Sequence, residues 1–389
     1  MKVLFVINSY YTKGNGLCAS ARRTVKKLRE AGLHVRVLST FNHDSHGEQP
    51  HYMLSEYHLP IFDSVVTKQG YMFAKKDKQT IKRAVEWADV IHLEEPFGLQ
   101  MYVAKLAKKL NKPCTSTYHL HPENLFASVY LSRSKFINGF TMWMWKRMVF
   151  NKCQIVQCPT QNVKERLAHA KYRAQLRVIS NGLVMEDLMH LDPNRVVEKG
   201  PNEPKYTVIT IGRFSVEKDI KTLIKSMKYS KHADDIQLII AGRGPKEKSL
   251  KKLAKKLMDE GYIKNEPQFG FYPLNELQDI AAKADLYVHC AFIEVEGLSC
   301  MEAIQIGLVP IIADGKYTAT SQFALDKMSI FKGRDPKDLA EKIDYWLDND
   351  EHRNKERTKY IGLGKEYAIE SSITELIQMF EDAIEMKKI

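Results

Sequence analysis

The chain consists of two runs of alternating strand and helix patterns, separated by a short segment with no periodicity. Short apolar stretches that predict buried strands alternate with amphipathic stretches that predict helices, first over residues 2–179 and again over residues 206–312. This alternation is typical of a parallel sheet covered by helices. Residues 198–204 hold two prolines, a glycine and several charges, which predicts a linker between two such domains.

The length of 389 residues exceeds that of one ordinary hydrophobic core, in agreement with two domains. We expect an N-terminal domain over residues 1–190, a C-terminal domain over residues 205–370 and a final helix over residues 371–389. The expected strands are Lys2–Ile7, Val35–Ser39, Val90–Leu93, Cys114–Tyr118, Ile155–Cys158, Arg177–Ile179, Tyr206–Gly212, Ile236–Ala241, Asp285–Ala291 and Val309–Ile312.

The net charge of +12 favours an anionic partner: a phosphorylated substrate, an anionic lipid surface or a nucleic acid. A solvated, lysine-rich surface is the alternative, and it accounts for the lysine run between residues 246 and 256. The chain shows no nucleic-acid recognition motif, so we expect no nucleic-acid partner.

The six cysteines include no CxxC pair, which argues against a metal site and a disulfide framework and favours a reducing, cytoplasmic location. The first strand is too short for a signal peptide, and no apolar stretch approaches the ~20 residues of a membrane span.

Two carboxylates eight residues apart, Glu294 and Glu302, flank the helix start predicted at Gly297, Leu298 and Ser299. The segment follows a buried strand, and open α/β sheets bind ligands beyond the carboxyl ends of their strands. The free N–H groups of a helix start suit a phosphate group. Favourable placement of acids at a helix N-terminus is the alternative, and it suits Glu296 better than this pair.

A second cationic element, Gly212 with Arg213 and Lys218, follows the first strand of the second domain. Arginine offers a planar fork to a phosphate and lysine a point charge, while glycine lets the backbone approach closely. Arg213 and Lys218 could also be surface cations that open a helix. Cations oppose the dipole at a helix N-terminus, so an anionic ligand explains them better.

In the first domain, too, candidate site residues follow the predicted strands. Gly14 and Gly16 follow its first strand, where a glycine loop can cradle a diphosphate or simply form a turn. The loop lacks a full GxGxxG pattern, so a dinucleotide site is not indicated. Two later strands end in further candidates, namely His119, His121, Glu123, Glu94 and Glu95. Structural roles are the alternative, and the spacing of these residues does not favour a metal site.

Taken in order, these features resemble glycosyltransferase family 4, and the resemblance covers nearly the whole chain. It implies the GT-B fold, with two Rossmann-like domains facing each other across a cleft and a last helix that crosses back to the first domain. It also implies retaining chemistry on a nucleotide sugar, with no cofactor and no metal. Cationic side chains and helix-end amides then stabilise the leaving diphosphate.

The resemblance also assigns roles to residues. His119 matches the histidine that contacts the transferred sugar, and Glu294 would bind the sugar hydroxyls. The amides of Gly297 and Leu298 would bind the phosphates, and Glu302 the ribose diol. Gly14 and Gly16 match the loop beside the donor phosphates, whereas His121, Glu123, Glu94 and Glu95 are candidates for the acceptor side. The paired glutamates at 94 and 95 depart from the family pattern.

The segment from Phe126 to Lys152 mixes seven aromatic residues with five cations and contains no acid. A helix of this composition suits a bilayer surface with anionic headgroups. A core helix with inward tryptophans and solvated cations fits the composition equally well. Besides Phe126, the aromatic residues are Tyr130, Phe136, Phe140, Trp143, Trp145 and Phe150.

These observations favour a peripheral membrane enzyme on the cytoplasmic face that moves a hexose from a nucleotide diphosphate sugar to a lipid or glycan. Family frequency favours UDP-glucose as donor. The resemblance implies that the acceptor binds the N-terminal domain, where residues 126–152 suit a lipid such as diacylglycerol or a lipid-linked oligosaccharide. A non-catalytic partner subunit or glycan-binding protein is the alternative, and a sugar-nucleotide 2-epimerase fits the motifs less well.

Overall fold

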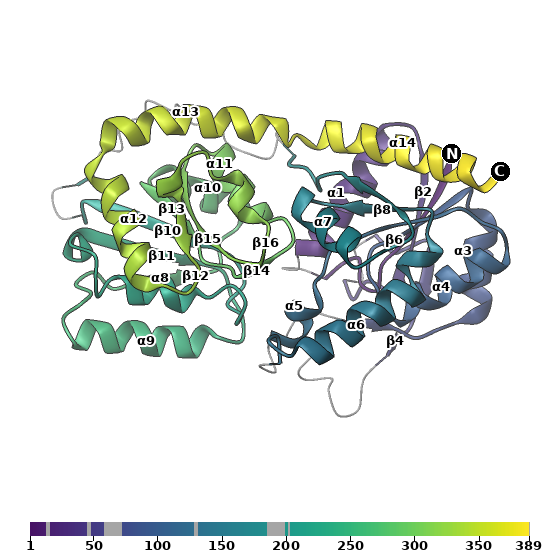
Figure 1. Ribbon diagram of the computed structural model, residues 1–389, viewed down its shortest axis with the longest axis horizontal. Helices are drawn as coiled ribbons and strands as arrows, with labels where there is room; N and C mark the ends of the chain where they lie inside the picture. The colour runs from purple at the N-terminus through teal and green to yellow at the C-terminus, as the bar shows by residue number, and fades with distance from the viewer. Residues whose placement is uncertain are drawn as a thin grey trace. The chain divides into compact units, whose positions relative to one another are not determined.

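The computed structural model describes residues 1–12, 16–44, 48–57, 72–127, 131–184, 199–200 and 203–388. The chain forms two compact units (Figure 1). Unit 1 contains Met1–Gly182 together with Ile369–Ile389, and unit 2 contains Leu183–Ala368. Each unit is a parallel sheet with helices packed around it, as the strand and helix alternation of the sequence predicts.

The sheet of unit 1 has the strand order β3-β2-β1-β6-β7-β8-β9, and every neighbouring pair is parallel. The order reverses between β1 and β6, which is the switch point where such sheets bind ligands. The strands are β1 (Lys2–Val6), β2 (His34–Thr40), β3 (Tyr52–Leu54), β6 (Val90–Leu93), β7 (Cys114–Thr117), β8 (Ile155–Cys158) and β9 (Gln175–Val178).

The helices of unit 1 begin at residues that cap their free N–H groups. Asp77, Ser134 and Thr160 accept from backbone N–H groups of the first turns of α3, α6 and α7. The helices are α1 (Gly16–Glu30), α3 (Lys78–Trp87), α4 (Gly98–Lys109), α5 (Pro122–Ala127), α6 (Lys135–Met148), η1 (Phe150–Lys152) and α7 (Gln161–His169). A small antiparallel pair joins β4 (Glu56–Tyr57) to β5 (Phe73–Ala74).

The last helix, α14 (Ile369–Lys388), also belongs to unit 1. It buries an apolar face that includes Leu376 and Phe380, and the Phe380 ring lies 5.3 Å from the His92 ring of β6. Ion pairs join Glu370 to Lys27 of α1 at 3.0 Å, and Asp382 to Arg177 of β9. Unit 1 is therefore built from both ends of the chain.

Unit 2 repeats the arrangement with the parallel order β12-β11-β10-β13-β15-β17. Its order reverses between β10 and β13, which gives this unit its own switch point. The strands are β10 (Tyr206–Ile211), β11 (Ile236–Ala241), β12 (Gln268–Gly270), β13 (Leu286–His289), β15 (Val309–Asp314) and β17 (Ile330–Lys332). A short parallel pair, β14 (Ile293–Glu294) with β16 (Tyr317–Thr318), lies beyond the carboxyl end of β13.

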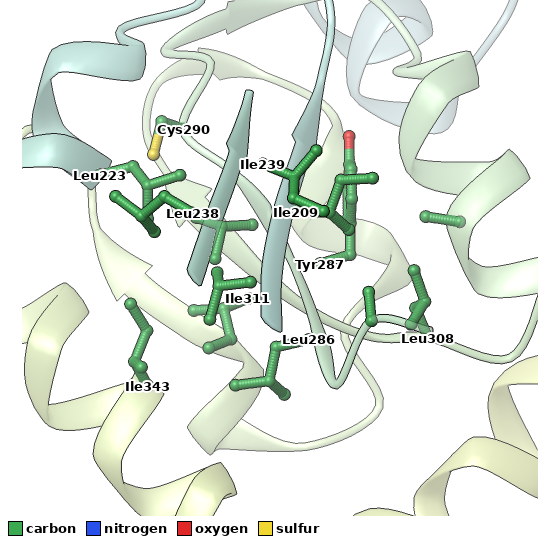
Figure 2. Packing of buried hydrophobic residues seen from close by; sticks show 14 of the residues in the cluster. Ile209, Leu223, Leu238, Ile239, Leu286, Tyr287, Cys290, Leu308, Ile311 and Ile343 are labelled. Atoms are coloured by element: carbon green, nitrogen blue, oxygen red, sulfur yellow. The ribbon is translucent and has the colours of Figure 1, made fainter. Parts of the chain in front are cut away.

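Apolar side chains of both central strands and several helices form the core of unit 2. Figure 2 shows Ile209, Leu238, Ile239, Leu286 and Ile311 packed together, all less than a tenth exposed. The surrounding helices are α8 (Ile220–Ser226), η3 (Ala233–Asp235), α9 (Glu247–Asp259), α10 (Leu274–Ala282), α11 (Leu298–Gln305), η4 (Thr320–Phe323), η5 (Lys327–Ser329), α12 (Pro336–Asp348) and α13 (Asp350–Glu366).

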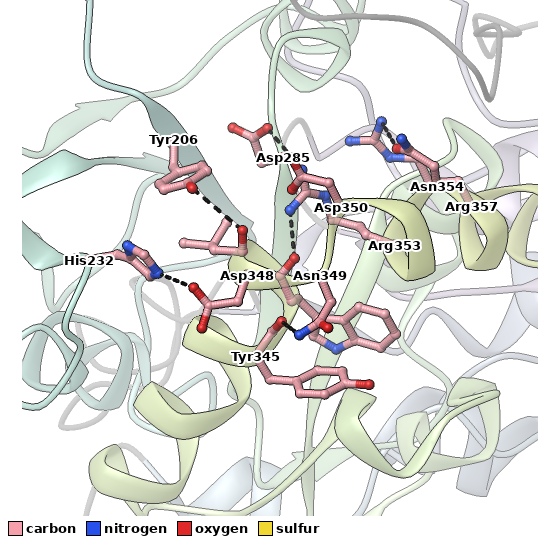
Figure 3. A network of polar contacts seen from close by, with 12 residues as sticks. Tyr206, His232, Asp285, Tyr345, Asp348, Asn349, Asp350, Arg353, Asn354 and Arg357 are labelled. Atoms are coloured by element: carbon pink, nitrogen blue, oxygen red, sulfur yellow. Dashed lines mark hydrogen bonds and ion pairs between the residues drawn. The ribbon is translucent and has the colours of Figure 1, made fainter.

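A buried arginine fixes the junction of α12 and α13 (Figure 3). Arg353 is 5% exposed; it donates from Nη1 to the Trp346 carbonyl at 2.6 Å and pairs with Asp350 at 2.8 Å. Its guanidinium also lies 3.9 Å from Asp285, whose carboxylate accepts from the Thr207 amide at 2.7 Å. These contacts anchor α13 to the amino-terminal edge of β10 and β13.

Within the described residues, none of the helices combines the length and the apolar character that crossing a membrane demands. The six cysteines are free and buried.

The loops after β10 and β11 approach so closely that Gly242 has no room for a side chain. A Cβ at this residue, whose φ is +149°, would lie 1.9 Å from the Gly212 carbonyl oxygen. We expect Gly242→Ala to lower the free energy of unfolding by about 3 kcal/mol in urea titrations. Gly261→Ala is the matched control, since φ is +81° there but no atom lies within 4 Å. It should cost only about 1–2 kcal/mol, and equal losses for the two variants would contradict the packing argument.

Candidate functional site

In unit 2, the segment after β13 brings Glu294 and the start of α11 together. Glu294 ends β14, and the chain turns at Gly297, where φ is +93° and a Cβ would meet Thr320 at 2.1 Å. Only glycine fits this turn. The turn leads into α11 at Leu298, and the partly buried Leu298 and Ser299 hold the free amides of the first turn.

Glu294 lies between two basic side chains. Lys218 Nζ donates to its Oε2 atom, and His289 Nε2 lies 3.5 Å from the same oxygen. Burial raises the pKa of Glu294, but the Lys218 charge and His289 outweigh this effect and lower the pKa to about 2. Glu294 is therefore an anion near neutral pH, and Lys218 holds its position.

A chain of buried polar groups continues behind Glu294. His289 Nδ1 lies 2.9 Å from the Tyr287 hydroxyl, which lies 3.2 Å from Ser299 Oγ on α11. Burial lowers the pKa of His289 and raises that of Tyr287, and both Glu294 and Glu302 add to the rise at Tyr287. The structure thus groups Lys218, Glu294, Ser299 and Glu302, as the motif spacing predicts. His289 was not among the predicted site residues, although a histidine at the end of an apolar strand indicates such a position.

The loop after β10 places a second cation at the same switch point. Arg213 Nη2 donates to Glu217 Oε1 at 3.0 Å, and Ser215 Oγ donates to that oxygen at 2.6 Å. The Arg213 side chain keeps 32% of its surface exposed, so its guanidinium can still reach a ligand. A Cβ at Gly212 would lie 3.9 Å from the Lys218 stem, which shows how closely Lys218 covers this glycine. Glu217, which orients Arg213, was also not among the predicted site residues.

In unit 1, Gly16 is the exposed first residue of α1, directly after the first loop. Gly14 falls outside the described residues. Behind this loop, Cys18 of α1 donates to the Ser9 carbonyl at 2.7 Å, which fixes the helix start to the end of β1. The first turn of α1 carries no acid, so its N–H groups are compatible with an anion.

Glu94 is the centre of a polar network at the carboxyl edge of β6 and β7. Its carboxylate accepts from His119 Nε2 at 2.8 Å and lies 3.0 Å from His92 Nε2. His92 also contacts Thr115 and Thr117 at 2.9 Å each. Burial raises the pKa of Glu94, but the two histidines outweigh it and lower the pKa to about 2.

This geometry orients His119. Because the Glu94 carboxylate can only accept, the His119 Nε2 atom carries a proton, and Nδ1 is the nitrogen left for a ligand. The His119 side chain is 11% exposed, whereas Glu94 is only 3% exposed. Glu94 is therefore nearly inaccessible and orients the His119 ring, and its expected role on the acceptor side stays a prediction.

Glu95 joins the two loops of the switch point. Its Oε2 atom accepts from the backbone N–H and the side-chain amide of Asn8, both at 2.7 Å, and from Gln100 at 3.0 Å. Burial raises its pKa. All these contacts lie inside the protein, so Glu95 holds the loop after β1 against the loop after β6.

His121 and Glu123 lie within the fold of unit 1. Glu123 is 3% exposed and receives both of its carboxylate bonds from Arg166 Nη2, at 2.8 Å each. His121 is fully buried, and its Nδ1 atom lies 3.2 Å from the Tyr118 hydroxyl. Both side chains are thus buried in unit 1, and a role in acceptor binding stays a prediction.

Comparison with known proteins gives two family matches. A model described as "Glycosyltransferase Family 4" matches residues 14–187, and one described as "Glycosyl transferases group 1" matches residues 193–360. The two matches follow one another along the chain and cover most of both units.

Two curated proteins with similar sequences are transferases. Alpha-monoglucosyldiacylglycerol synthase of Streptococcus pneumoniae is 24% identical over 327 residues, 81% of this chain and 71% of that protein. GDP-mannose-dependent alpha-mannosyltransferase of Corynebacterium glutamicum is 24% identical over all of this chain and 90% of its own length. Among solved structures, sucrose-phosphate synthase of Thermosynechococcus elongatus superposes with a TM-score of 0.73 at 15% identity, covering 98% of each chain. The GT-B fold class predicted from the sequence is confirmed.

The low pKa of Glu94 leads to a prediction about acid stability. A pKa near 2 in place of 4.5 corresponds to about 3 kcal/mol of stability, present above pH 4.5 and lost as the pH falls toward 2. Glu94→Gln should lower the free energy of unfolding by about this amount at pH 7, and the difference should shrink below pH 4.5. Denaturant titrations at several pH values measure it.

Glu165→Gln on the exposed surface of α7 is the matched control and should stay within about 0.5 kcal/mol of the wild type. A Glu94→Gln loss that does not change with pH would mean that the carboxylate charge is not what stabilises this network.

Proposed function

We propose that this chain, which belongs to glycosyltransferase family 4, transfers a hexose from a nucleotide diphosphate sugar to a membrane lipid or a lipid-linked glycan. The observation that carries the proposal is the ion pair of Lys218 and Glu294 at the switch point of unit 2. It lies beside the free amides of α11 and the exposed guanidinium of Arg213. The cations and the helix start suit the diphosphate of such a donor, and the carboxylate suits its sugar hydroxyls.

The diphosphate half of the donor is the ligand for the cationic groups. Lys218, Arg213 and the amides of Leu298 and Ser299 can share its negative charge, which grows as the sugar–phosphate bond breaks. Gly212 and Gly297 let the backbone approach the phosphates. We propose that these groups replace a metal ion in this role.

The sugar and the nucleoside are the ligands for the two carboxylates. Glu294 is ionised and can accept hydrogen bonds from two sugar hydroxyls, and Glu302 from a ribose diol. Without a donor, Lys218 and Glu294 neutralise each other's charge. When the donor binds, the Lys218 side chain can turn from Glu294 to a phosphate. His289 and Tyr287 act through Glu294 and α11 rather than on the ligand.

UDP-glucose is the donor that we propose. The pneumococcal relative is named for a glucosyl product, whereas the corynebacterial relative is named for GDP-mannose. Family frequency supports the glucosyl choice, and the two names define the donors that an experiment must compare.

The acceptor is assigned to unit 1, with diacylglycerol as the first candidate because the pneumococcal relative is named for a diacylglycerol glycolipid. His119 would meet the transferred sugar through Nδ1, with Glu94 as its positioning residue. We propose that the protein meets such an acceptor at the cytoplasmic face of a membrane.

The stereochemistry would be retaining: a donor phosphate oxygen takes the proton of the acceptor hydroxyl as the new bond forms on the same face of the sugar from which the diphosphate leaves. No side-chain base is then needed.

Calorimetric binding to UDP-, GDP- and ADP-glucose and to GDP-mannose tests the donor assignment. We expect one donor to bind in the presence of a chelator, and Lys218→Ala or Glu294→Ala to weaken it at least tenfold, because each removes a charge-assisted hydrogen bond. Lys221→Ala, a lysine of the same segment with 57% exposure, should bind like the wild type.

Transfer to diacylglycerol in mixed micelles then tests the acceptor. If no nucleotide sugar binds to the wild type, or if Lys221→Ala weakens binding as much as Lys218→Ala, the proposed donor site is wrong.

A further inference from the structure

Helix α6 is turned so that three of its four aromatic side chains face outward. It buries Asn138, Thr141 and Trp145 but exposes 83% of Phe136, 56% of Phe140 and 55% of Trp143. Positions 136, 140 and 143 fall on one stripe of a helix. A helix of a soluble domain normally buries its apolar stripe, so this outward aromatic face has another use.

The exposed apolar side chains of the described residues gather on this helix and its flanks. Five of the fourteen large hydrophobic residues that are most exposed lie between residues 131 and 148. They are Leu131, Phe136, Phe140, Trp143 and Met148. Phe140 and Trp143 stack with ring centroids 5.8 Å apart, which makes the patch continuous. Tyr130, from the same aromatic segment of the sequence, lies outside the described residues.

The charges of this segment are all positive. Residues 126–152 contain no acid, and Lys135 and Arg147 are exposed, with Arg147 on the aromatic stripe itself. Two other cations serve the fold: Lys146 donates to the Ala170 carbonyl at 2.7 Å, and Lys152 donates to the last carbonyls of α6. The exposed charge therefore lies at both ends of the aromatic stripe.

We propose that the outward face of α6, formed by Phe136, Phe140, Trp143, Lys135 and Arg147, docks on an anionic phospholipid bilayer. Aromatic rings are favoured at the depth of the headgroups, and cations are attracted to anionic lipid phosphates. The docking rests on the proposed function, because it would bring a lipid acceptor to unit 1. Helix α6 packs against α5, which directly follows the loop that holds His119 and His121, so this face belongs to the acceptor side of unit 1 (Figure 1).

A second copy of the chain fits this face less well. In a symmetric dimer the same patch meets itself, so the cations of one helix would lie near those of the other with no acid from this segment between them. A bilayer with anionic headgroups supplies the missing negative charge.

Sedimentation with vesicles tests the proposal. The wild type should bind vesicles that contain phosphatidylglycerol and bind pure phosphatidylcholine vesicles less tightly. Replacing Phe136, Phe140 and Trp143 by glutamine, which keeps helix propensity, should weaken binding roughly tenfold or more. Lys135→Gln with Arg147→Gln should weaken it about fivefold per charge on the anionic vesicles only.

Matched controls are Tyr229→Gln, an aromatic residue 53% exposed in unit 2, and the pair Lys355→Gln with Lys365→Gln on the exposed face of α13. Both should bind vesicles like the wild type. The proposal fails if the wild type does not bind anionic vesicles or if the α6 variants bind equally well. It also fails if the aromatic variant changes only the oligomeric mass measured by ultracentrifugation.

Nucleotide-sugar binding without vesicles separates this proposal from the proposed function. The α6 variants should bind the donor and melt like the wild type, since none of the changed residues lies in the donor site. Loss of vesicle binding with intact donor binding supports the docking face. Absence of donor binding in the wild type would remove the proposed function, while the vesicle result would still decide whether α6 contacts lipid.

Discussion

Each unit depends on a parallel sheet whose strand order reverses beside its first strand. At that reversal the loops after two neighbouring strands leave the sheet in opposite directions. Polar side chains of these loops can therefore lie close together without interrupting the hydrogen bonds between the strands. Unit 1 uses it for the loops that carry Asn8 and Glu95, and unit 2 for the loops that carry Lys218 and Glu294. The buried strands behind these loops are almost continuously apolar, which keeps the loops in register.

The two units place a low-pKa carboxylate at this point by the same electrostatic means. Glu94 lies between His92 and His119, and Glu294 lies near Lys218 and His289. In both cases burial opposes ionisation and the basic neighbours outweigh it. The difference is in exposure: Glu94 is only 3% exposed, whereas Glu294 keeps 17% of its side chain exposed.

Much of this arrangement could be predicted from the sequence, because long apolar runs and their turn residues define strands such as β10, β11 and β15 without any tertiary information. Short edge strands could not, since Gln268–Gly270 has no apolar pattern and forms β12 only by pairing with β11. The grouping of Lys218 with Glu294 followed from motif position, but the partners of Glu94 required the register of β6 against β7. Helix α6 was ambiguous for a physical reason: it buries asparagine and threonine and exposes phenylalanine, so hydrophobicity alone cannot orient it.

The packing of α14 in unit 1 has a consequence for how the protein is made. Residues 183–368, which form unit 2, leave the ribosome before α14 does, so unit 2 can complete its core while unit 1 still lacks a helix. Until Phe380 has been synthesised, His92 packs against the Phe5 ring but lacks the Phe380 ring as a second neighbour. The first sheet to emerge is therefore completed only after unit 2 has been synthesised, when α14 can pack against it.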